Sequence, residues 1–430
     1  MDAEAFGVMM ETVGRDALEQ LQLRKFQLVV DQVLGPNEFY TQRYAEAGIR
    51  SSSDISTWDA FRRLPFTTKK ELSADQGANP PYGTNLSFPA NSYVKIHQTS
   101  GTTGEPLRCL DTVESWDWWA ECWAKVFRAC GVTAEDRIFY AFSFGPFIGF
   151  WSSYEGARKI GALAVPGGGM SSFQRLRAIL ANDVTVLVCT PTYALHLAEL
   201  AEQEGIDLAG CSVRTTIHAG EPGAGLPATR DRIQRAWDAT TFDHAGATEV
   251  GAWGFECADR TGLHVNEGEF IVEIIDPETQ EAATEGEVVI TNLGRAGFPV
   301  FRYRTGDRAK IDTSPCSCGR TFARLEGGVI GRVDDVLIVR GINVFPSAVE
   351  NVIRSIPEIG EFAVDIDRQH ELDEMVIRVE VTGDAEHAVS AAENAIRNAL
   401  NLRARVVAVQ TGSLPRFDLK ARRFTDHRKG

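Results

Sequence analysis

Short apolar runs alternate with amphipathic stretches between residues 137 and 242, and this alternation predicts an α/β fold. The run VTVLVC at 184–189 has no polar alternation, which is typical of a strand buried on both faces. Strands that alternate with helices predict a mostly parallel sheet with crossover helices, in which ligands bind beyond the carboxyl ends of the strands. We expect strands at 137–142, 162–165, 184–189, 213–217 and 240–242, and helices at 148–160, 174–181, 193–203 and 228–237.

The pattern changes twice further along the chain. The runs EFIVEII at 269–275 and GEVVIT at 286–291, with turn residues between them, predict a β-rich subdomain. Beyond a boundary near 331–335, we expect a helix (347–356), two strands (361–367 and 374–381), a helix (388–400) and a strand (406–410). The sequence therefore predicts a large N-terminal domain over residues 1–333 and a small, mobile α+β C-terminal domain over residues 334–430.

Composition limits the classes of function. The 430-residue chain carries 44 basic and 59 acidic side chains, and its net charge of −15 would repel nucleic acid and anionic lipid. The first residues lack the features of a signal peptide, and no run of about 18 apolar residues predicts a membrane span. The eight cysteines are scattered, so a disulfide framework is not expected. We expect a cytoplasmic enzyme with neither nucleic acid nor a membrane as its partner.

Six polar motifs follow one another along the chain. The first, with two glycines and four hydroxyl side chains, can crowd N–H and O–H donors around a phosphate. It is not a Walker A loop, because Gly104 is followed by Glu105 and Pro106. One such motif alone would be an ordinary turn, but six in this order are not explained as turns. They are TSGTTG at 99–104, HAGEP at 218–222, DHAGATE at 243–249, RYRTGD at 302–307, GRVDD at 331–335 with RG at 340–341, and LPRFDLK at 414–420.

The order of these motifs resembles the adenylate-forming superfamily of acyl-CoA synthetases, luciferases and adenylation domains. The short chain, the GEP after a strand and the FGPF at 144–147 bring it closest to phenylacetate–CoA ligases. The resemblance covers about residues 90–430. It implies a ligase that uses ATP and Mg²⁺ to activate a carboxylic acid as an acyl-adenylate, transfers the acyl group to CoA, and releases AMP and pyrophosphate. A homodimer is also what the family suggests.

The resemblance implies how the nucleotide would be held. The first motif would close over the β- and γ-phosphates, and residues of the second and third motifs would line the adenine and ribose. The phosphate loop consists of Ser100, Gly101, Thr102, Thr103 and Gly104. The nucleotide wall consists of Gly220, Glu221, Pro222, Asp243, His244, Ala245, Gly246, Ala247 and Thr248.

Charged residues of the later motifs would carry the adenylation chemistry. Glu249 would bind Mg²⁺ as a hard oxygen ligand, and Asp307 would accept both ribose hydroxyls. Arg332 would lie near the nucleotide at the domain junction. Lys420 would neutralise the charge that builds when the carboxylate attacks the α-phosphate.

The resemblance also implies a domain rotation between the two half-reactions. The hinge would be Asp334, the first Asp of the R-x-D-D motif. After rotation Arg340 and Gly341 would turn toward the thioester site, and Lys420 would withdraw.

The sequence departs from the family pattern at three positions. Glu105 stands where the family usually has a Lys, which weakens the electrostatics of the phosphate loop. Leu419 replaces the Gly before the catalytic Lys and makes that loop stiffer. Ala245 replaces the usual Tyr of the third motif.

Aromatic residues gather around the Gly145-Pro146 turn after the first expected strand. An aromatic-lined pocket suits a flat aryl or arylacetic acid, while ordinary core packing is the alternative for each ring. The family places the acid beside the GEP segment, which adds two further residues. The candidate acid-binding residues are Tyr140, Phe142, Phe147, Trp151, His218 and Ala219.

Three cysteines and a histidine form a candidate zinc site. Cys257 and His264 lie before the later β-rich segment, and Cys316 and Cys318 follow it, so folding back of the chain would bring them together. Such a set completes a tetrahedral structural site with no open position. Some relatives of phenylacetate–CoA ligases hold zinc there; unliganded buried cysteines are the alternative.

Two other functions stay open at this point. An adenylating enzyme that loads a separate carrier-protein thiol would share the first half-reaction. A zinc-bearing binding protein without catalysis would explain Glu105 and Leu419. It would leave the presence of Glu249, Asp307, Arg332 and Lys420 together unexplained.

Overall fold

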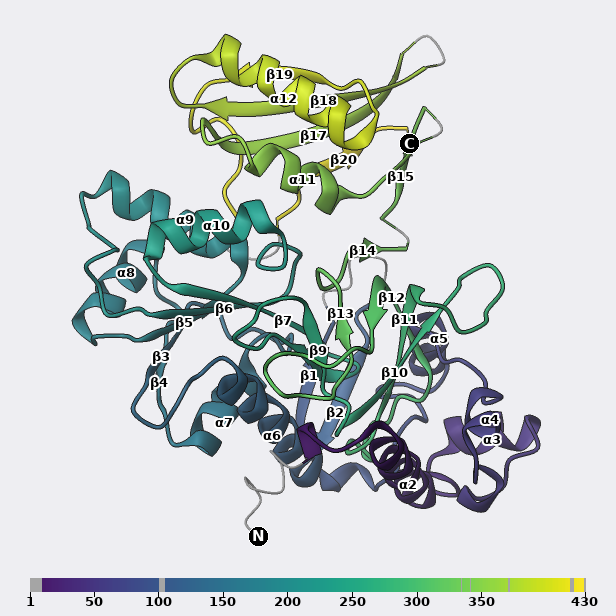
Figure 1. Ribbon diagram of the computed structural model, residues 1–430. Coiled ribbons are helices and arrows are strands. Elements are labelled where there is room, and N and C mark those ends of the chain that lie inside the picture. Colours follow the sequence, from purple (N-terminus) through teal and green to yellow (C-terminus); the bar gives the residue numbers. More distant parts are fainter. Residues whose placement is uncertain are drawn as a thin grey trace.

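The computed structural model describes residues 10–99, 105–333, 335–340, 342–369, 372–417 and 421–428 (Figure 1). Five parallel strands lie in the order β4-β3-β5-β6-β7 within a larger sheet. Their connections are helical, which confirms the expected α/β arrangement to within a few residues at the element ends. The strands are β3 (Arg137–Tyr140), β4 (Leu163–Pro166), β5 (Val186–Cys189), β6 (Thr215–His218) and β7 (Thr240–Ala247), and the helices are α7 (Trp151–Ile160), α8 (Ser172–Ala181), α9 (Pro191–Gln203) and α10 (Pro227–Trp237).

Helices cover both faces of these parallel strands. Ile138 and Tyr140 of β3 pack in one cluster with α6 (Val113–Ala129), while Phe139 packs in another with α8, α9 and α10. Every residue of β5 is buried, because its side chains alternate between these two clusters. The apolar run without alternation in the sequence therefore corresponds to a strand that is covered on both sides.

The β-rich subdomain is continuous with the parallel strands. From β7 the sheet continues through antiparallel neighbours in the order β8-β9-β13-β12-β11-β10, with β14 paired to β12. One twelve-stranded sheet thus carries both halves of the large domain. The added strands are β8 (Gly251–Phe255), β9 (Leu263–Val265), β10 (Phe270–Ile275), β11 (Glu285–Asn292), β12 (Tyr303–Asp312), β13 (Arg324–Leu325) and β14 (Gly331–Arg332).

Residues 10–92 form helical segments that pack against this sheet. The hairpin of β1 (Tyr93–Gln98) and β2 (Arg108–Thr112) holds the TSGTTG motif in its connection. In the described part of the chain, no helix is both long and apolar enough to span a bilayer. The helical segments are α2 (Arg15–Val33), α3 (Glu38–Glu46), η1 (Ser52–Asp54), α4 (Trp58–Arg62), α5 (Lys69–Ala78) and η2 (Ala90–Ser92).

The small C-terminal domain has its own sheet, in the order β19-β18-β17-β20, and its own apolar core. The expected helix–strand–strand–helix–strand order is present. The sequence did not reveal the short hairpin β15–β16 or the final strand β20, which pairs in parallel with β17. The elements are β15 (Leu337–Val339), β16 (Ile342–Val344), α11 (Pro346–Arg354), β17 (Ile359–Gln369), β18 (Leu372–Val381), α12 (Ala385–Leu400), β19 (Arg405–Val409) and β20 (Phe424–Asp426).

Candidate active site

The candidate residues of two motifs meet at the carboxyl ends of β6 and β7. His218 and Asp243 are register partners in the parallel pair, and Cys189 of β5 is the next neighbour of His218. Residues 243–247 lie within β7 rather than on a loop, so our expectation that this motif follows the strand was wrong. The strand extends because β8 pairs with it from Gly251 to Phe255.

Asp243 lies in a narrow glycine-lined position. It is 9% exposed, and a Cβ added to Gly225 or to Gly328 would lie 2.8 or 3.2 Å from its Oδ2. Burial raises the pKa of the Asp243 carboxyl well above its ordinary value, and the neighbouring Glu256 adds to the shift while Arg230 opposes it. The backbone at Gly225 and Gly328 therefore packs closely on this carboxyl, and a side chain at either position would crowd it.

His218 presents an unpaired nitrogen. Its Nδ1 donates to the Cys189 carbonyl at 3.1 Å, because a carbonyl oxygen can only accept. Its Nε2 is buried and has no hydrogen-bond partner among the described residues. Burial lowers the pKa of His218 to about 4, so the ring is neutral at pH 7 and Nε2 is a hydrogen-bond acceptor. His244 is also buried, with Nδ1 donating to Gly254 at 2.6 Å and a pKa lowered to about 4 by burial.

Glu249 has a partner that the sequence did not indicate. The glutamate is 7% exposed, and its Oε1 accepts from the Tyr303 hydroxyl at 3.3 Å. Lys69 Nζ, at the start of α5, lies 3.2 Å from the same oxygen, and its side chain is 42% exposed. Lys69 belongs to no recognisable motif and lies 180 residues from Glu249, so only the fold could reveal the pair.

Asp307 and Arg332 also come together. They are register partners in the pairing of β12 with β14, and Arg332 Nη1 lies 3.4 Å from Asp307 Oδ1. The segment between Gly328 and Arg332 connects this pair to Asp243, because Gly328 lies beside the Asp243 carboxyl. Asp307 lies within strand β12 rather than on a loop. Three charged residues of the expected nucleotide site are thus joined by one short segment.

The aromatic residues at 140–151 divide into two groups. Tyr140 is fully buried and donates its hydroxyl to the Ser153 carbonyl at 2.9 Å, so it is part of the core. Phe144 has a left-handed φ of 50° and packs edge-on against Trp151 at 4.8 Å. Phe142, which is also buried, contacts Phe144 and the half-buried Phe147 at 5.4 and 5.6 Å.

This aromatic turn lies next to strand β1. The N–H of Gln98, at the end of β1, donates to Pro146 at 2.8 Å, which joins the turn to the hairpin of the TSGTTG motif. Lys95 of the same strand lies 6.0 Å from the Trp151 ring and 5.3 Å from the Trp116 ring. Lys95 was not a sequence candidate, because an isolated lysine on a strand carries no pattern.

Eight candidate residues lie outside the described part of the chain: Ser100, Gly101, Thr102, Thr103, Gly104, Asp334, Gly341 and Lys420. Thr99 and Leu107 close the base of the phosphate loop through two hydrogen bonds of 3.0 and 3.1 Å. Glu105 is exposed, and Arg340 donates to the Asp373 carbonyl at 2.7 Å, within the C-terminal domain.

The predicted zinc ligands come together in space. The ligand atoms of Cys257, His264, Cys316 and Cys318 all lie within 4.8 Å of one another. Cys257 and Cys316 sulfurs are 3.8 Å apart, and Cys318 Sγ lies 3.5 Å from His264 Nε2. Tetrahedral zinc with Zn–S bonds of about 2.3 Å places its sulfur ligands about 3.8 Å apart. His264 Nδ1 donates to Phe322 at 3.1 Å, which leaves Nε2 for the metal, so the set fits zinc.

Comparison with known proteins identifies the family. The model of the AMP-binding enzyme C-terminal domain matches residues 341–428. The chain is 31% identical to the phenylacetate–coenzyme A ligase of Pseudomonas putida, over 88% of this chain and 85% of that one. It is 30% identical to the enzyme of the same name from Escherichia coli K12, over 97% of both chains. The chain belongs to the phenylacetate–CoA ligase family. It is therefore an ATP-dependent acid–thiol ligase that joins a carboxylic acid to CoA through an acyl-adenylate.

Solved structures indicate which arrangement of its domains this ligase adopts. It superposes on a 2-hydroxyisobutyryl-CoA ligase in the postadenylation state with a TM-score of 0.93 and 28% identity, over 98% of this chain and 92% of that one. The same enzyme in the thioesterification state, with CoA, gives a TM-score of 0.74 at 97% and 91% coverage. The small domain of the phenylacetate–CoA ligase homologue thus lies as it does in the postadenylation state.

Proposed function

We propose that this ligase activates an aryl or arylacetic acid. The observation that carries the proposal is the position of the aromatic turn at 144–151, between the phosphate-loop hairpin and β7. Gln98 joins the turn to the hairpin, and Trp123 contacts both Phe150 at 6.0 Å and His244 at 4.2 Å. Aromatic edges and faces bind a flat ring well. The relatives named for phenylacetate support this choice over the aliphatic hydroxy acid of the structural neighbour.

We further propose that His218 and Ala219 complete the acid site. The buried acceptor Nε2 of His218 is available to a donor on the substrate or on an ordered water. The core packing of Tyr140 and Phe142 makes them supports of the pocket wall. Phe144, Phe147 and Trp151 are then the rings that choose the acid.

The nucleotide is proposed to lie across Asp243 and Asp307, with its phosphates toward Glu249. Asp307 would accept the ribose hydroxyls, with Arg332 beside it, and Gly220 and Pro222 would flank the base. Glu249 would hold Mg²⁺, which supplies positive charge to the phosphates when it is bound. Lys69, released from Glu249 by that cation, would contact the phosphate oxygens and offset the missing loop lysine at Glu105.

For the second half-reaction we propose that residues 334–430 move as one domain about Asp334. The separate apolar core of this domain and its short connection through β14 support a rigid-body rotation. Arg340 and Gly341 would then reach the thioester site. CoA is the acceptor of the named relatives, and a carrier-protein thiol is the alternative acceptor that the assay below distinguishes.

We propose that the Cys257–His264–Cys316–Cys318 cluster binds structural zinc. Four protein ligands leave no coordination position for water or substrate. The cluster joins the end of β8 and strand β9 to the segment before β13, so the metal would stabilise this interior part of the sheet.

The test is acid-dependent ATP–pyrophosphate exchange with phenylacetate, ring-substituted phenylacetates, benzoates and small aliphatic hydroxy acids. We expect exchange with arylacetic or aryl acids, its loss in Lys420→Ala, and formation of the acyl-CoA when CoA is added. Exchange with aliphatic acids alone would refute the aromatic assignment. Exchange that yields no thioester with CoA would refute CoA as the acceptor. A homodimer stays a prediction that the mass in solution would test.

A further inference from the structure

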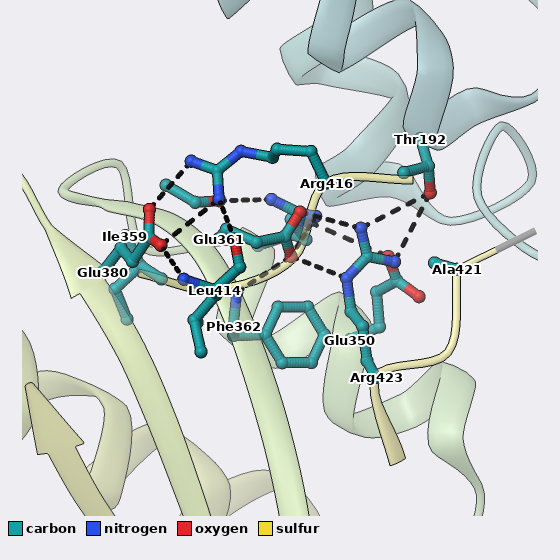
Figure 2. A network of polar contacts seen from close by, with 12 residues as sticks. Thr192, Glu350, Ile359, Glu361, Phe362, Glu380, Leu414, Arg416, Ala421 and Arg423 are labelled. Atoms are coloured by element: carbon teal, nitrogen blue, oxygen red, sulfur yellow. Dashed lines mark hydrogen bonds and ion pairs between the residues drawn. The ribbon is translucent and has the colours of Figure 1, made fainter. Parts of the chain in front are cut away.

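Contacts between the two domains lie on both sides of residues 418–420, and Figure 2 shows Arg423 reaching Thr192 of the large domain. On its C-terminal side, the N–H of Ala421 donates to Glu221 Oε2 at 2.7 Å. The other oxygen of this carboxylate accepts from the N–H of Thr192, at the start of α9, at 3.0 Å. Glu221, although part of the GEP motif, therefore uses both oxygens to join the lysine segment to the large domain.

On the N-terminal side of the segment, Arg416 binds one carboxylate of each domain. Its Nε and Nη2 donate to the two oxygens of Glu199, on α9, at 2.8 and 2.7 Å. Its Nη2 and Nη1 donate to Glu380, on β18, at 2.8 and 3.2 Å. A bidentate guanidinium–carboxylate pair fixes direction as well as distance, so Arg416 holds its segment in one orientation on α9.

A third contact follows the segment. Arg423 is 4% exposed and pairs with Glu361 of its own domain at 2.7 Å, while its Nη1 and Nη2 lie 3.4 Å from the Thr192 hydroxyl. Arg232 of α10 contacts the small domain in return, and its Nε donates to the Arg354 carbonyl at 2.7 Å. The interface is therefore polar and directional, which suits an interface that forms and separates in each cycle.

We propose that Glu199, Glu221 and Arg416 form an interdomain clamp that positions the Lys420 segment for adenylation. The proposal rests on the proposed role of Lys420. Arg416 precedes that lysine by four residues and Ala421 follows it directly, so the clamp holds the chain on both sides of it. These contacts belong to the arrangement shared with the postadenylation state, and the different arrangement of the thioesterification state requires them to break. The clamp thus favours the first half-reaction and opposes the second.

The test compares the two half-reactions in Glu199→Lys. Glu199 lies on α9, where its carboxylate meets Arg416, and the substitution places two cations together at the domain interface. We expect pyrophosphate exchange to fall about tenfold or more, because the adenylation arrangement becomes less populated. Formation of acyl-CoA from synthetic acyl-AMP and CoA is expected to stay within about twofold of the parent rate or to rise. Glu199→Gln keeps an acceptor but loses the charge. Its rate of pyrophosphate exchange is expected to lie between that of the parent and that of Glu199→Lys.

The matched control is Glu19→Lys, which breaks a 3.2 Å pair with Arg15 within the large domain at similar exposure. It is expected to leave both half-reactions unchanged. Equal losses of both half-reactions in Glu199→Lys, or exchange within twofold of the parent, would overturn the clamp. Absence of exchange and of thioester formation in the parent protein, with every acid tested, would instead refute the proposed function.

Discussion

A fully buried ion pair holds the backbone beside the proposed Mg²⁺ ligand. Arg295 Nε and Nη2 donate to the two oxygens of Asp111, on β2, at 2.7 and 2.8 Å, and both side chains are 0% exposed. Arg295 Nη1 donates to the carbonyls of Thr248 and Glu249 at 2.9 and 3.0 Å. Asp111 therefore orients an arginine that in turn fixes Glu249.

Asp111→Asn is expected to destabilise the large domain strongly. The amide keeps the shape of the side chain, but its NH₂ group faces an N–H donor of Arg295, and the buried guanidinium loses its counter-charge. Breaking one partner of a fully buried pair costs about 3–5 kcal/mol of unfolding free energy. Because Arg295 also holds the Glu249 carbonyl, we expect the KM for MgATP to rise in the exchange assay.

Urea unfolding followed by tryptophan fluorescence is the suitable assay. All eight tryptophans lie before residue 254, so the signal reports the large domain. The control is Asp117→Asn, which removes an exposed partner of Lys159 and is expected to cost less than about 1 kcal/mol. A loss of less than about 1 kcal/mol in Asp111→Asn would refute two conclusions: that water is excluded from the Asp111–Arg295 pair, and that the charge of Asp111 holds Arg295 in position.

Three further outcomes follow from the site. Lys69→Ala is expected to raise the KM for ATP about tenfold or more and to weaken pyrophosphate binding, with the KM for the acid unchanged, as exchange kinetics and calorimetry would measure. Cys316→Ser is expected to abolish zinc content, close to one ion per parent chain by elemental analysis, and to lower the melting temperature. Burial lowers the pKa of His97, His218 and His244 to about 4, below the ordinary value of 6.5. Unfolding therefore takes up protons between these two pH values, and the unfolding free energy falls as pH drops from 6.5 toward 4. Equal stability at pH 7 and pH 5 in urea titrations would contradict that prediction.

The sequence predicted the parallel strands and the C-terminal elements because local patterns define them. Apolar runs identify buried strands. The start of α9 was expected two residues late, at 193, whereas the helix begins at Pro191, where the Thr190 side chain accepts from the Tyr193 N–H. The extension of β7 was missed because DHAGA contains small and polar residues. The pairing of β7 with β8 explains these small residues. A Cβ added to Gly254 of β8 would lie 3.1 Å from the Ala245 Cβ of β7, so only small side chains fit there.

The candidate site was predictable where residue type and order carry the information. The four zinc candidates were chosen from their spacing, and the structure confirms that they come together. Lys69 and the contacts of Arg416 with Glu199 could not be predicted, because they join residues about 180 and 217 positions apart that share no local pattern. The motif alone led us to expect Glu221 in the nucleotide wall. In the structure its carboxylate accepts from one backbone N–H of each domain, those of Thr192 and Ala421.

The aromatic turn between β3 and α7 has a consequence for how this enzyme can diversify. The rings proposed to choose the acid lie on the connection between β3 and α7 and at the first residue of α7, while Asp243, Asp307 and Arg332 lie on β7, β12 and β14. Substitutions in the turn can therefore change the accepted acid while the hydrogen-bonded strands keep their pairing. Such separation lets duplicated genes drift toward new acids without losing adenylation, and it marks Phe144, Phe147 and Trp151 as the positions to randomise in a library for altered specificity.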